Sequence, residues 1–125
     1  MRLKPLLVAA ALCAAPGLAF AHEVANGPNG GQVTEVQGHH VEFTVKDKQI
    51  VLFLSDGNSK PIASKGASGR VVIQDGGKQL TVDLAPAEPN LMSAKLEAPL
   101  AAGAKVVVSA KLSDGHDIQA RFVAK

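Results

Sequence analysis

The fold class is decided by one stretch of sequence, His39-His40-Val41-Glu42-Phe43-Thr44-Val45-Lys46-Asp47-Lys48-Gln49-Ile50-Val51-Leu52-Phe53-Leu54. In its first half, apolar Val41, Phe43 and Val45 alternate with polar side chains, and this period of two is typical of a half-buried strand. Lys46-Asp47-Lys48 then predicts a turn. Residues 50–54 are apolar throughout, as expected of a central strand that is covered on both faces. The stretch therefore predicts two β-strands joined by a turn.

The same signals continue to the end of the chain. Residues 70–74 and 79–84 flank Asp75-Gly76-Gly77, a strong hairpin signal, and we expect Pro86 and Pro89 to end the second of these strands. A last hairpin is predicted around Asp114-Gly115, with Ser113 and His116 paired across a two-residue loop. The residues expected to face the core in its two strands are Val106, Val108, Ala110, Leu112, Ile118, Ala120 and Phe122. The pattern predicts an all-β fold, an immunoglobulin-like β-sandwich of about seven or eight antiparallel strands.

The first residues predict an export signal. Basic Arg2 and Lys4 precede the apolar residues 6–15, and Ala19-Phe20-Ala21 fits the small-x-small pattern of a cleavage site. The apolar run is shorter than the roughly 20 residues that span a bilayer. We therefore expect residues 1–21 to be removed and a periplasmic protein to begin at His22, with a cut after Ala19 as the alternative.

The remaining chain divides into two parts. Residues 22–31 are rich in Gly, Pro and Asn and predict an irregular N-terminal arm. Residues 32–125 are expected to form the β-sandwich domain, and their number suits a single core.

Composition excludes several classes of function. Arg2 and Lys4 account for the formal net charge of +2, so the exported domain is neutral and gives no reason to expect nucleic acid as a partner. No transmembrane segment is expected in it. The single cysteine, Cys13, lies in the predicted signal, which excludes cysteine nucleophiles and cysteine zinc sites. No nucleophile elbow, H-E-x-x-H motif or P-loop occurs, and we expect no enzyme.

Histidines are the best candidate ligands for a metal ion, because neutral imidazole suits copper, zinc and nickel. A terminal His22 offers its α-amino group and its ring to one ion. His116 follows the Asp114-Gly115 turn, where the carboxylate of Asp114 can act as a co-ligand. His39 and His40 are neighbours on one strand and point to opposite faces. His39 shares a face with Val41, and His40 shares the other face with Glu42, with which it can form a histidine–carboxylate pair. The candidate ligands are His22, His39, His40, Asp114 and His116.

Two stretches resemble known families. The start at His22 and the ending Ser113-Asp114-Gly115-His116 with Phe122-Val123 resemble the CopC-like periplasmic copper-binding proteins. That resemblance implies an immunoglobulin-like sandwich and Cu²⁺ ligation by His22 and His116, with Asp114 nearby. The pattern departs from that family at Asp117, where proline is common. Gly30-Gly31-Gln32-Val33 with residues 39–43 is similar to small β-domains found with heavy-metal efflux systems and their periplasmic adaptors, and no ligand set comes with it.

These observations predict a periplasmic protein that binds a divalent metal for resistance or delivery. Copper(II) is the favoured ion, and zinc and nickel are alternatives. The main rival function is a metal-independent adaptor or interaction module that contacts an efflux component. A copper oxidase of the histidine-brace kind is a third hypothesis, based on His22 alone.

Overall fold

The computed structural model describes residues 25–125; the predicted signal peptide and His22 lie outside this range. Within it, the chain forms nine β-strands and no helix. The strands are β1 (Ala25–Asn26), β2 (Gln32–Val36), β3 (His39–Lys46), β4 (Gln49–Asp56), β5 (Ser68–Asp75), β6 (Lys78–Ala87), β7 (Leu91–Lys95), β8 (Lys105–Lys111) and β9 (Asp117–Val123).

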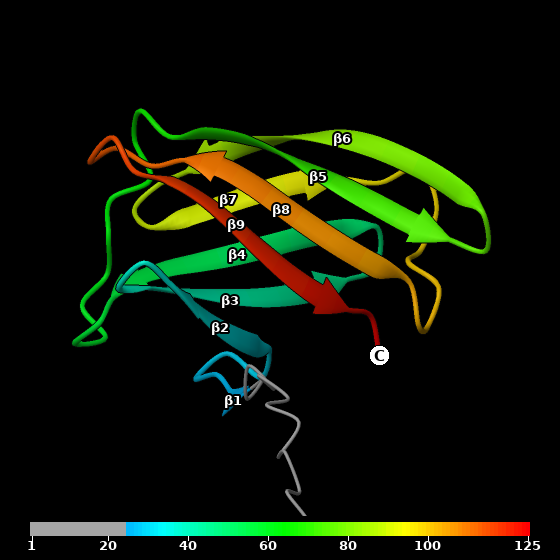
Figure 1. Ribbon diagram of the computed structural model, residues 1–125, viewed down its shortest axis with the longest axis horizontal. Helices are drawn as coiled ribbons and strands as arrows, with labels where there is room; N and C mark the ends of the chain where they lie inside the picture. The colour runs from blue at the N-terminus through cyan, green and yellow to red at the C-terminus, as the bar shows by residue number, and fades with distance from the viewer. Residues whose placement is uncertain (1–24) are drawn as a thin grey trace, which may run out of the picture.

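All neighbouring strands pair antiparallel, in the order β1-β2-β3-β4-β7-β6-β5-β8-β9. Figure 1 shows β5, β6 and β8 in one layer and β2, β3 and β4 in another. Strand β6 belongs to both, because its first part pairs with β5 and residues 85–87 pair with β7. The strand therefore continues through Pro86, where the expectation was wrong, and ends at Ala87, before Pro89. Pro86 pairs with Met92 on one side only, and such a position tolerates the missing proline N–H.

The two ends of the sheet approach each other at β2 and β9. The Gln32 side chain donates from Nε2 to the carbonyl oxygen of Val123 at 2.7 Å. Phe43 of β3 and Phe122 of β9 stack with ring centroids 4.8 Å apart. The all-β prediction is confirmed. Because the strands make one nearly closed sheet, the immunoglobulin-like assignment stays a prediction.

The core lies between the two layers and follows the predicted alternation. Val41 and Phe43 are buried, as are the predicted inward residues of β8 and β9. Val45 departs from the pattern and is 39% exposed, because it lies at the end of β3 beside the turn to β4. In β4, only Ile50, Leu52 and Leu54 are buried. Val51 and Phe53 on its other face are half-buried, so the expectation of a strand covered on both faces was wrong.

Replacing Leu52 with alanine tests this assignment of the core. The Leu52 side chain is fully buried, and we expect Leu52→Ala to lower the free energy of unfolding by about 2–5 kcal/mol. Leu80→Ala is the matched control, because Leu80 is 51% exposed and should change stability by no more than about 0.5 kcal/mol. Urea unfolding of both variants makes the comparison, and equal losses would contradict the described core.

Candidate metal centre

His39 is the first residue of β3 and lies on the core face of that strand. The turn before it contains Gln37 and Gly38, both with positive φ, which brings β3 back along β2. His39 shares the inward face with Val41, and only 9% of its side chain is exposed. A polar ring is thereby held at the rim of the core, with its position fixed by the strand.

The turn between β8 and β9 supplies the other two members of the site. The ladder ends at the pair Lys111 and Asp117, after which the Leu112 N–H donates to the His116 carbonyl at 2.9 Å. Gly115 has a φ of 89° and donates its N–H back to the carbonyl of Leu112. The predicted two-residue loop with Ser113 opposite His116 was therefore wrong. The wider turn places Asp114 and His116 on the same side.

Ser113 ties this turn to a distant part of the chain. Its hydroxyl donates to the carbonyl oxygen of Ala63 at 2.9 Å, in the connection between β4 and β5. The contact holds the turn against the body of the domain.

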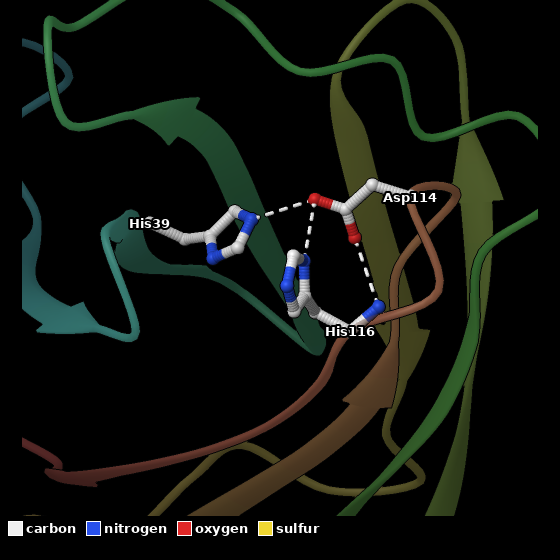
Figure 2. Close-up of side chains that lie close together, drawn as sticks. All are labelled: His39, Asp114 and His116. Atoms are coloured by element: carbon white, nitrogen blue, oxygen red, sulfur yellow. Dashed lines mark hydrogen bonds and ion pairs between the residues drawn. The ribbon is translucent and has the colours of Figure 1, made fainter.

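His39, Asp114 and His116 meet at one end of the domain, and we call them the triad. His39 Nε2 lies 2.8 Å from Asp114 Oδ2, and His116 Nδ1 lies 3.0 Å from the same oxygen. Figure 2 shows both rings directed at this carboxylate, from β3 on one side and from the turn on the other. One ligand atom from each residue can be chosen so that all lie within 4.8 Å of one another. Two imidazoles and a carboxylate in this arrangement form a candidate site for a divalent cation.

The carboxylate of Asp114 is held in its charged form. The pKa of Asp114 lies well below its ordinary value, because the His116 ring, the His116 backbone N–H and the His39 ring all hydrogen-bond to it. Hydrogen bonds to the ionised form of a carboxyl favour that form. Side-chain exposure rises from His39 to Asp114 (39%) and His116 (55%), so the triad is open to solvent on the side of the turn.

The second ring nitrogen of His39 has an unusual environment. With an ionised Asp114 as acceptor, Nε2 of His39 carries the proton and donates. Its Nδ1 is buried and has no hydrogen-bond partner among the described residues. An unpaired buried polar atom in a native structure calls for an explanation, and strain, a catalytic role or an ordered water or ion are the usual ones.

His40 lies on the opposite face of β3 and does not join the triad. Its Nε2 is 3.6 Å from Oε2 of Glu35, and 27% of its side chain is exposed. The expected pairing of His40 with Glu42 is not what the structure shows. His22 lies outside the described residues. Among the other candidate ligands, the structure brings together His39, Asp114 and His116.

Glu42 has a different role, which the sequence reasoning missed. This residue is 4% exposed, and its carboxylate accepts hydrogen bonds from the backbone N–H groups of Asn29 and Gly31 and from the Asn29 side-chain amide. A Cβ at Gly27 would meet the Glu42 carboxyl group, and one at Gly31 would meet the Phe43 carbonyl oxygen. The two glycines therefore allow residues 27–31 to close over Glu42. The signal in the sequence was a strand glutamate close to an Asn-Gly-Gly loop.

Comparisons of the chain with protein-family models, with curated proteins and with solved structures find no match. The resemblances to CopC-like proteins and to efflux-associated β-domains gain no support from them. Within the described part of the chain, no helix is suited to crossing a membrane.

Replacing Glu42 with glutamine tests the hydrogen bonds that hold residues 27–31. Glutamine keeps the size but turns one acceptor oxygen into a donor that faces other donors. We expect Glu42→Gln to lower the free energy of unfolding by about 1–3 kcal/mol in chemical denaturation. Glu35→Gln is the matched control, because the Glu35 side chain is 66% exposed and should change stability little. An unaltered stability of Glu42→Gln would show that these contacts do not hold the loop.

Proposed function

We propose that this protein binds one divalent transition-metal ion through His39, Asp114 and His116, for metal resistance or delivery. The observation that carries the proposal is the convergence of two imidazole nitrogens on one ionised carboxylate oxygen. These residues are separated by up to 77 positions in the sequence, and only the fold brings them together. The conclusion is a binding function and not catalysis.

The chemistry of the donors favours a borderline ion. Imidazole suits copper, zinc and nickel, whereas calcium and magnesium prefer sites made of oxygen atoms. Copper(II) heads the general affinity order for such a site, so it is the ion we propose, with zinc and nickel as alternatives. The low pKa of Asp114 supports this assignment, because the carboxylate is ionised and supplies negative charge to a cation.

Coordination through Nε2 changes the second ring nitrogen of His39. The ring proton moves to Nδ1, which turns a buried acceptor without a partner into a buried donor without a partner in the described structure. An unsatisfied buried polar group costs about 1–3 kcal/mol, and this cost is present before and after binding. A histidine whose second nitrogen has an acceptor binds an ion more strongly than this one.

The remaining parts of the proposal come from the sequence. We propose a periplasmic location, from the export signal that residues 1–21 predict, and an immunoglobulin-like architecture for the two layers. His22 stays a proposed additional ligand.

A Cu²⁺ titration of the purified protein tests the proposal. We expect one ion per chain, and His116→Ala and Asp114→Asn should each weaken binding by about tenfold or more, since even outer-shell changes at metal sites reach that size. His40→Ala is the matched control and should bind as the unaltered protein does, because His40 lies on the opposite face of β3.

Two outcomes would overturn the assignment. Equal affinity for His116→Ala and the unaltered protein would remove the triad from consideration. Absence of binding altogether would leave the metal-independent adaptor as the better reading, and recovery of an efflux component by the histidine-free protein would then support it.

A further inference from the structure

Strands β2 and β9 run alongside each other without a shared ladder. In the described chain, β2 pairs with β1 and β3, and β9 pairs only with β8. We call the line where they meet the β2–β9 seam, comprising residues 32–36 and 117–123. It is joined at one end, where the buried Gln32 side chain donates to the carbonyl oxygen of Val123 at 2.7 Å.

The other end of the seam is open. No hydrogen bond joins β2 to β9 there among the described residues. A surface depression borders this end at Val36, Gln37 and residues 117–119, and it extends over the outer face of β5, β6 and β8. Because no ladder joins β2 to β9, local separation of the two strands at this end breaks no main-chain hydrogen bond between them.

The triad lies just beyond this open end. His39 follows directly after the turn that ends β2, and Asp114 and His116 lie in the turn that precedes β9. The His39–Asp114 hydrogen bond therefore connects the two strand ends that the seam leaves unpaired. An ion held by all three residues would connect the same ends more strongly, since each coordinate bond ties its residue to a common centre.

We propose that the bound metal ion closes the open end of the β2–β9 seam, so that metal occupancy controls how readily these two strands separate. The inference rests on the proposed function and adds a conformational consequence to it. Closure hides the free main-chain groups of β9. Without the ion, the His39–Asp114 hydrogen bond alone joins these strand ends, and local opening of the edge is more frequent. An exposed strand edge is the feature to which extended segments of other chains pair.

Hydrogen–deuterium exchange with and without one equivalent of Cu²⁺ tests this proposal. Any ligand that binds the folded state slows exchange through global unfolding in every strand alike. Closure of the seam predicts an additional local effect, in which peptides covering residues 32–38 and 113–123 exchange slower by about fivefold or more. The β5–β6 hairpin, residues 70–84, is the internal control and should not show this additional slowing. Equal slowing in all strands would overturn the proposal.

A substitution at the far end of the seam supplies a second test. Gln32→Ala removes the hydrogen bond to Val123, and the resulting looser seam should weaken Cu²⁺ binding although Gln32 touches no member of the triad. Gln79→Ala is the matched control, because Gln79 is exposed on β6. We expect weaker binding, by about fivefold or more, for Gln32→Ala alone. Equal affinity in both variants would show that the seam and the site are uncoupled.

The two tests separate this inference from the function it rests on. Tight one-to-one binding with uniform exchange protection and an unaffected Gln32→Ala variant would keep the metal site and remove the closure of the seam. Absence of binding would remove both. Should Gln32→Ala fail to fold, the exchange experiment on the unaltered chain still decides the question.

Discussion

The alternation of side chains along β3 is the constraint on which both the core and the site depend. Because successive residues point to opposite faces, placing Val41 and Phe43 in the core also places His39 on the core side and Glu42 on the outer side. A shift of register by one residue would exchange these faces and bury His40 in place of His39. Residues 27–31 close over the outer face through Glu42, while the inner face ends in the imidazole that meets Asp114.

The site is a product of sheet closure. His39 belongs to the part of the sheet that contains β3 and β4, whereas Asp114 and His116 belong to the turn between β8 and β9. These parts meet because the sheet curls until Phe43 stacks on Phe122 and Gln32 reaches Val123. The same closure leaves a seam with no ladder, and the candidate ligands lie at its open end. Stability of the fold and geometry of the site are therefore linked through one region of the molecule.

Much of the fold could be predicted from local patterns, and the grouping of the site could not. The period of two predicted that His39 and His40 face opposite ways and that the alternate residues of β8 and β9 are buried. Turn chemistry was less informative: Pro86 lies within β6, where the strand changes partner, and the Asp114-Gly115 turn is wider than a two-residue loop. Which histidine meets Asp114 depends on the order of strands in the sheet, and periodicity within a strand carries no information about that order. The partners of Glu42 could not be predicted either, because the sequence does not show that residues 27–31 contact β3. From sequence alone, these residues are predicted to be an irregular arm.

The most direct test of the central claim is the nitrogen NMR spectrum of the histidine rings before and after addition of Zn²⁺, a diamagnetic ion that the same donors accept. The account predicts that the resonances of Nε2 in His39 and Nδ1 in His116 shift together at one equivalent, while both ring nitrogens of His40 stay in place. Shifts at His40, or at His116 without His39, would contradict a metal site built on the two imidazoles that share the Asp114 carboxylate.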